Sequence, residues 1–191
     1  MREGLRRLAI AAVLPALVLG VGIGGALAAS TFPDPAGDVK GGAGPDLTSV
    51  SVSNTAQAVT FRVRFAKAPP LRLSVPGRWV DMLLIGIDVP PRGPRPGSQG
   101  WDGVDYAAGV HGSQKVAVVV RKVSGWTTVA RVAVVARGRM LSFSIDRRTL
   151  GNPAWFDFVV TAGRELPDQN GARGGADSAP ARGTFHYRLT G

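Results

Sequence analysis

Cysteine is absent from the 191-residue chain, and histidine occurs only twice. The absence of cysteine excludes both disulfide bonds and a cysteine nucleophile. His111 and His186 lie in stretches that alternate like strands, where a histidine is more often structural or exposed than a catalytic base. The patterns Gly-x-Ser-x-Gly and His-Glu-x-x-His and the P-loop do not occur in the sequence. We therefore expect no enzymatic activity. A glycan-active enzyme, which would need two positioned carboxylates such as Asp102 and Asp105, is the least favoured function.

Acidic residues are also scarce relative to basic ones. The chain has 23 Lys and Arg against 13 Asp and Glu, for a net charge of +10; the first 28 residues contribute +2 of this, which leaves +8. Such a charge favours anionic partners such as cell-wall polymers. Like charges do not occur in runs, so we expect no specific nucleic-acid site. If the strand with Arg62 and Arg64 lay beside the strand with His186 and Arg188, the four would form a basic stripe.

The first 28 residues are arranged like an export signal. Three arginines precede an uncharged apolar run from Leu8 to Leu27, and the run ends in an Ala-Leu-Ala peptidase pattern. Cleavage is expected before Ala29, so that residues 1–28 form the signal and residues 29–191 form one secreted domain. The alternative is a retained membrane anchor facing outside, because about 20 apolar residues can span a bilayer. A membrane partner is expected only in that case.

The rest of the chain shows a period of two almost throughout. Val59, Phe61, Val63 and Phe65 alternate with polar residues, as in a half-buried antiparallel strand. Similar stretches predict strands at 48–52, 59–65, 79–88, 104–110, 115–123, 126–136, 139–146, 155–161 and 184–189. Loops are expected at 89–100 and 162–182, with one helical turn at 147–151. About nine short strands without a long helix predict an all-β antiparallel sandwich of the immunoglobulin or jelly-roll kind.

Several segments resemble, in their order, one group of exported bacterial β-sandwiches. They are FPDPAGD (32–38), PDLTSVSVSN (45–54), AVTFRVRFA (58–66), LLIGID (83–88), GVDYAAGV (103–110), FSIDRRTLG (143–151), WFDFVVTAG (155–163) and ADSAPARGTFHYRL (176–189). Together they are similar to the DOMON-like group, which includes family 9 carbohydrate-binding modules and the C-terminal module of glucodextranase. The resemblance implies a β-sandwich that binds calcium in its opening loop. The chain departs from the family pattern in two places, and each departure removes a carboxylate that the family often has. The first is Val89-Pro90 after Asp88, and the second is Arg182 in the closing loop.

Two aspartates in the opening loop are the best candidates for metal ligands. Asp34 and Asp38 flank Pro-Ala-Gly in a stretch without helical pattern. Folding this loop brings two negative charges together, which is unfavourable unless a cation lies between them, and Ca²⁺ accepts such oxygen ligands. Asp177 would complete the site if the first and last strands are neighbours. The alternative is an ordinary turn in which each aspartate caps its own backbone.

An exposed aromatic ring is the second kind of site expected, because flat rings stack on sugars. Trp101 follows the Pro-rich loop and is the candidate platform, with Asp102 available to bond hydroxyl groups. Trp79 and Trp155 lie in apolar strands and are expected in the core, whereas Trp126 could lie in the core or on the surface. The sequence therefore predicts an exported, non-catalytic binding module for carbohydrate or wall polymer. The alternative is a wall-associated structural or assembly protein without a small ligand.

The order of the N-terminal segment makes one prediction about the mature protein. The secreted form should begin at or near Ala29, because the peptidase pattern ends there. N-terminal sequencing of secreted and membrane-fraction protein measures this directly. Protein that still begins at Met1 in the membrane fraction would instead identify residues 8–27 as an anchor.

Overall fold

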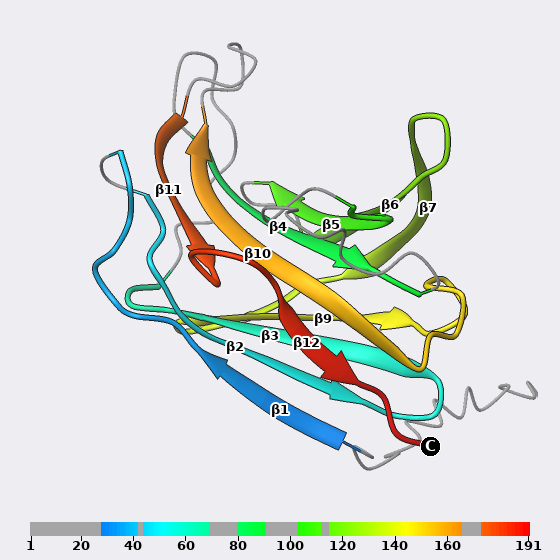
Figure 1. Cartoon of the computed structure of the whole chain (residues 1–191). Helices are drawn as coiled ribbons and strands as arrows, with labels where there is room; N and C mark the ends of the chain where they lie inside the picture. Colours follow the sequence, from blue (N-terminus) through cyan, green and yellow to red (C-terminus); the bar gives the residue numbers. More distant parts are fainter. Residues whose placement is uncertain (1–27, 42–43, 69–79, 91–102, 112–114, 166–172) are drawn as a thin grey trace, which may run out of the picture.

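The computed structural model describes residues 28–41, 44–68, 80–90, 103–111, 115–165 and 173–191. These residues form twelve strands, arranged as two facing antiparallel sheets (Figure 1). Among them, no helix is long and apolar enough to cross a membrane. The strands are β1 (Ala28–Pro33), β2 (Leu47–Asn54), β3 (Ala58–Phe65), β4 (Val80–Asp88), β5 (Tyr106–His111), β6 (Val116–Lys122), β7 (Trp126–Ala133), β8 (Val135–Arg137), β9 (Met140–Asp146), β10 (Trp155–Glu165), β11 (Arg173–Ala179) and β12 (Phe185–Arg188).

The two sheets have different sizes and share no strand. The five-stranded sheet has the order β1-β2-β3-β9-β8. The seven-stranded sheet has the order β11-β10-β4-β5-β6-β7, and β12 also pairs with β10. Strand β10 is 11 residues long, so its first part pairs with β12 and its later part with β11. The chain therefore returns at its end to β10, the strand next to the edge of the larger sheet.

The hydrophobic core lies between the sheets and follows the alternation seen in the sequence. In β3, the side chains of Val59, Phe61 and Val63 are fully buried, whereas the intervening arginines are exposed. The ring of Phe61 lies 5.9 Å from that of Phe143 in its own sheet and 5.7 Å from that of Phe158 in the opposite sheet. Such aromatic pairs add to the free energy gained by burying apolar surface. Phe61 thus joins the two layers near their centre.

The all-β sandwich predicted from the sequence is confirmed, although the described residues contain twelve strands instead of about nine. Strand β11 lies inside the loop expected over 162–182, because its sequence RGGADSA has no large apolar residue to alternate. The strand expected over 126–136 is interrupted at Val134, where the chain passes from β7 in one sheet to β8 in the other. The expected helical turn is a tight turn with hydrogen bonds between residues three apart, such as Leu150 N to Arg147 O.

The basic stripe does not form. Strand β3 pairs with β2 and β9, whereas β12 pairs with β10 in the other sheet. Arg62 and Arg64 are therefore separated from His186 and Arg188 by the sandwich itself. Period-two alternation shows which residues share a face, but it does not show which strands are neighbours.

Truncation of the central ring should test how far the core depends on it. Phe61→Ala is expected to lower the free energy of unfolding by about 3–5 kcal/mol, because it leaves a cavity between two sheets that cannot close around it. Urea unfolding followed by circular dichroism measures the loss. Arg64→Ala, an exposed change in the same strand, should cost less than about 0.5 kcal/mol. Equal losses in the two variants would contradict the central place of Phe61.

Candidate metal centre

The opening loop leaves the end of β1 and runs across to the other sheet. Asp34 N still donates to Thr48 O at 3.0 Å, so the loop begins as a continuation of the pairing between β1 and β2. Lys40 then forms an isolated antiparallel bridge with Ala176 of β11, with N···O distances of 2.8 and 2.9 Å. The loop is consequently tied to both sheets, and the chain between these two ties carries Asp38.

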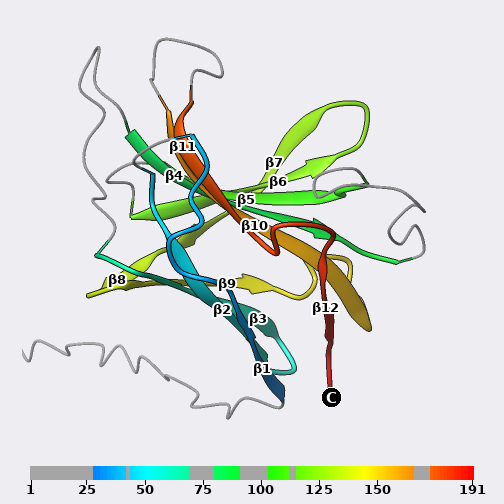
Figure 2. The ribbon, with the colours of Figure 1, turned by 60° about the vertical axis from the view of Figure 1, so that its left-hand side comes forward.

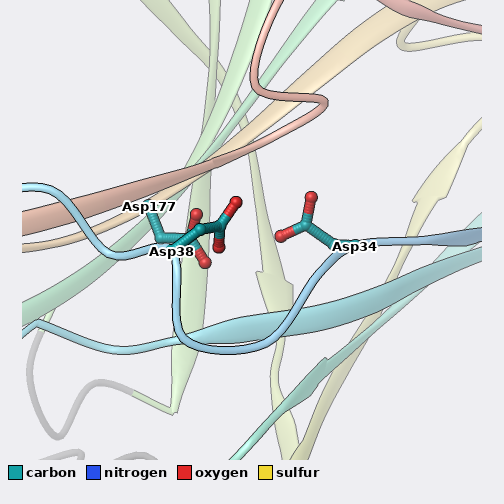
Figure 3. Close-up of side chains that lie close together, drawn as sticks. All are labelled: Asp34, Asp38 and Asp177. Atoms are coloured by element: carbon teal, nitrogen blue, oxygen red, sulfur yellow. The ribbon is translucent and has the colours of Figure 1, made fainter.

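Three aspartate side chains converge between the loop and β11 (Figure 3). Asp34 and Asp38 come from the loop and Asp177 comes from β11, and one carboxylate oxygen of each lies within 4.8 Å of the others. The structure therefore brings together all three aspartates expected as metal ligands. The first and last strands do meet across the sandwich, where the rings of Phe32 and Phe185 lie 4.8 Å apart and Tyr187 OH donates to Ala28 O at 3.1 Å. Asp177 itself lies in β11, which precedes the last strand. It reaches the loop because β11 bridges Lys40 and contacts β2.

A fourth aspartate holds the loop in its curved form. Gly37 has a φ angle of 90°, which favours glycine because it has no side chain to clash. Its amide N donates to both carboxylate oxygens of Asp46, at 3.1 and 3.0 Å. Asp46 was not predicted as a site residue. The chain passes from the loop back into β2 at this residue, and no spacing rule links it to Gly37.

Burial and missing partners set the cluster apart from an ordinary capped turn. The side chains of Asp34 and Asp177 belong to residues that are only 8% and 4% exposed. Asp177 Oδ2 accepts a hydrogen bond of 2.7 Å from Leu47 N. In contrast, the buried atoms Asp34 Oδ2 and Asp38 Oδ1 have no hydrogen-bond partner among the described residues. Buried polar atoms are nearly always paired, so two unpartnered oxygens in neighbouring carboxylates require an explanation that a capped turn does not give.

The same crowding changes the acidity of the cluster. Burial, followed by the negative charges of Asp177, Asp38 and Asp46, raises the pKa of Asp34 from 3.8 to about 7. Burial also raises the pKa of Asp177, while the hydrogen bond from Leu47 N works against this rise. Without a cation, the folded state therefore favours a proton on Asp34 near neutral pH. A divalent cation would replace that proton and offset the repulsion between the carboxylates.

The predicted sugar-binding residues Trp101 and Asp102 lie outside the described residues. A cavity of about 280 Å³ is lined by residues at the ends of β4, β5 and β6, including Tyr106 and Arg121. None of the three clustered carboxylates lines it. The acidic cluster is thus a compact site for an ion, separate from that cavity.

A second polar group lies on the face of the larger sheet that is turned away from the core. Asp157 pairs across the strands with Asp88 on one side and with His186 on the other. His186 Nδ1 lies 2.8 Å from Asp157 Oδ1, and the ring of Trp155 packs 5.3 Å from the imidazole. Trp155 is therefore half-buried on this outer face and not in the core as expected, because β10 turns Phe156 and Phe158 inward instead.

The comparisons with known proteins do not identify the chain. It matches no model of a known protein family and no curated protein. The DOMON-like resemblance therefore stays a prediction drawn from the quoted segments. The described residues form a β-sandwich with one cluster of three carboxylates that could hold a metal ion.

The raised pKa of Asp34 predicts a particular dependence of stability on pH in chelator. Between pH 4 and about 7 the folded Asp34 keeps a proton that the unfolded chain has lost. Raising the pH through this window therefore destabilises the fold, by up to about 1.4 kcal/mol per pH unit. Urea unfolding at pH 5, 6, 7 and 8 in chelator should show this decline.

Two variants distinguish the contribution of Asp34 to this pH dependence from that of the other acidic residues. Asp34→Asn cannot titrate and should flatten the decline, leaving the smaller part due to Asp177. Asp146→Asn, a change in an exposed aspartate outside the cluster, should keep the wild-type slope. Stability that rises steadily from pH 5 to pH 8 in the wild-type protein would show that Asp34 titrates at its ordinary pKa.

Proposed function

We propose that the protein is an exported, non-catalytic β-sandwich module that binds a calcium ion through Asp34, Asp38 and Asp177. The observation that carries this proposal is the pair of buried, unpartnered oxygens on Asp34 and Asp38 beside a third carboxylate. Three negative charges within such a small space are unfavourable unless a cation neutralises them. The bound ion would supply positive charge and several coordination positions at once.

The donor set favours calcium over other ions. All three side chains offer oxygen, and the group contains neither histidine nor cysteine, which zinc sites usually use. Calcium accepts six to eight oxygens with flexible geometry, and carboxylates, backbone carbonyls and water can all serve. Magnesium demands a tighter octahedron and keeps most of its water. A loop that supplies two carboxylates across a Pro-Ala-Gly turn suits the more flexible ion.

The ion would act as a clamp between the two sheets. Asp34 and Asp38 belong to the loop that follows β1, and Asp177 belongs to β11 on the edge of the other sheet. The described hydrogen bonds at this junction include the backbone bridge between Lys40 and Ala176 and the bond from Leu47 N to the carboxylate of Asp177. No disulfide bond can supplement them, because the chain has no cysteine. An ion that binds only the folded state would therefore stabilise the junction directly.

The proposed ligand of the module is a carbohydrate or an anionic cell-wall polymer outside the cell. The resemblance to exported carbohydrate-binding modules and the excess of basic residues support this choice. The alternative function is a wall-associated structural or assembly protein, in which the calcium clamp serves stability alone. Loss of binding to wall polysaccharide in Trp101→Ala, with the fold retained, would favour the first function over the second.

Removal of calcium should lower the melting temperature. At a hundredfold excess of calcium over Kd, the stabilisation is about 2.7 kcal/mol, which corresponds to a shift of roughly 5–10 °C for a domain of this size. Calorimetry in chelator and in millimolar calcium measures it, and magnesium should restore less of the loss. The calcium shift should also grow as the pH rises through about 7, since the ion needs Asp34 ionised.

Asp34→Asn distinguishes an ion site from a capped turn. In chelator this variant should be at least as stable as the wild-type protein, because it removes one of three crowded charges. In calcium it should be less stable, because it lacks a ligand. Asp146→Asn should retain the full calcium response, since Asp146 lies outside the cluster. Melting curves that are the same in chelator and in calcium for the wild-type protein would exclude the site.

A further inference from the structure

The exposed apolar side chains of the described residues are concentrated in one region. The large hydrophobic residues that are well exposed are Val123, Trp126, Val129 and Val135, with exposed fractions of 75%, 51%, 42% and 46%. All four lie between the end of β6 and β8. Scattered single residues of this kind need no explanation, but a set confined to one hairpin and its continuation marks a contact surface.

The outer face of β6 extends this apolar surface. Ala117 and Val119 of β6 are fully buried in the core, so the alternating Val116, Val118 and Val120 point to the opposite face. These three valines are half-buried and do not pack against the core. Their neighbours across the strand pair with β5 are small, since Gly109 faces Val118 and Ala107 faces Val120. The valines therefore stand on a face with little side-chain cover from β5.

This stretch of the chain carries only positive charge, and Asp105 borders it at the cavity that it lines together with Lys122 and Val123. No aspartate or glutamate occurs between Asp105 and Asp146, whereas this stretch contains six basic residues, Lys115, Arg121, Lys122, Arg131, Arg137 and Arg139. Lys122 lies opposite Trp126, with its Nζ 5.9 Å from the centre of the indole ring. Arg131 lies opposite Val118 and so projects from the same outer face. Neither cation makes an ion pair with a carboxylate of the described residues.

The β6–β7 hairpin projects away from the rest of the sandwich. Figures 1 and 2 both show its turn standing clear of the other strands. Val123 and Trp126 lie at this turn, which closes through the bond from Val123 N to Gly125 O at 3.1 Å. A flat partner could therefore reach the turn and the outer face of β6 without meeting the smaller sheet.

We propose that this surface docks on an anionic lipid bilayer. We call it the basic apolar face and define it by Val118, Val120, Lys122, Val123, Trp126 and Arg131. The exposed Val123 and the half-buried Val118 and Val120 gain free energy when they leave water, and tryptophan favours the boundary between hydrocarbon and headgroups. Lysine and arginine beside them would attract acidic headgroups. The face has an apolar tip and a positively charged border, and an anionic membrane is complementary to both.

Two other occupants fit the surface less well. A polysaccharide would stack on the ring of Trp126, but it would gain little from Val123 and the β6 valines. A second copy could pair with the free edge of β7, but Val129 forms a bulge there, because Val119 pairs with Ala130 and Val120 with Thr128. Bulges weaken edge pairing, and two such faces would also repel each other through their positive charges.

A fluorescent dye at the hairpin turn shows whether this face, and not another segment of the chain, enters the membrane. Because the protein has no cysteine, Ser124→Cys gives a single attachment point for an environment-sensitive fluorophore. With the full chain and phosphatidylglycerol vesicles, the emission at position 124 should shift to shorter wavelength. The shift should be absent with phosphatidylcholine vesicles. Gln57→Cys, in an exposed turn of the other sheet, is the matched label and should report water throughout.

Matched variants test the two parts of the surface. Lys122→Glu with Arg131→Glu should weaken binding to the anionic vesicles at least 25-fold, at about fivefold for each cation lost. Arg64→Glu with Arg188→Glu makes the same change in net charge away from the face and should have a much smaller effect. Val123→Ser with Trp126→Ala should abolish the emission shift. The calcium response of each variant should be unchanged, which separates this proposal from the ion site.

Several outcomes would overturn the proposal. Vesicle binding with a water-like signal at position 124 would assign the binding to another segment, such as residues 8–27. Equal shifts with neutral and anionic vesicles would remove the role of the cations. A signal at position 124 that appears with acidic polysaccharide or with rising protein concentration, but not with vesicles, would identify a polymer or a second copy as the occupant.

Discussion

Burial of two alternating apolar faces against each other is the interaction on which this structure depends. The chain has no disulfide bonds, and its described residues form no helix. The sheets therefore hold together through side chains such as Phe61 and Phe158, which meet across the layers. The acidic cluster exists because the sandwich brings β11 near the loop that follows β1, and the basic apolar face exists because β6 is apolar on both sides.

The acidic cluster is an electrostatically unfavourable arrangement within the sandwich. Two of its aspartates are buried, two of its oxygens have no hydrogen-bond partner in the part of the chain that the structure describes, and the pKa of Asp34 is raised to about 7. In natural proteins, strained groups and groups with a perturbed pKa cluster at functional sites. The proposed cation would offset this repulsion at the junction where the opening loop crosses from one sheet to the other. The proposed clamp would thus make stability depend on the calcium and the pH of the surroundings.

The two proposed sites carry charges of opposite sign. Negative charge gathers at the loop and β11, and the stretch between Asp105 and Asp146 has positive charge alone. An ion at the first site would leave the second free to meet an anionic surface.

The sequence by itself determined the class of fold and two of the clustered aspartates. Period-two alternation depends only on neighbouring residues, so β3, β9 and most of the other strands could be predicted with small errors at their ends. Asp34 and Asp38 could be singled out because they are close along the chain in a loop without helical pattern. Strand β11 could not be found, since its small residues show no alternation.

Only the tertiary structure decided which distant residues meet. It placed Asp177 beside the loop through the bridge at Lys40, turned Trp155 outward, and put β3 and β12 in separate sheets. It also showed that Asp46 holds Gly37 and that the β6 valines lie on a face without core contacts. Strand neighbours depend on how the whole chain crosses between sheets, and that information is not contained in the spacing of residues along any one segment.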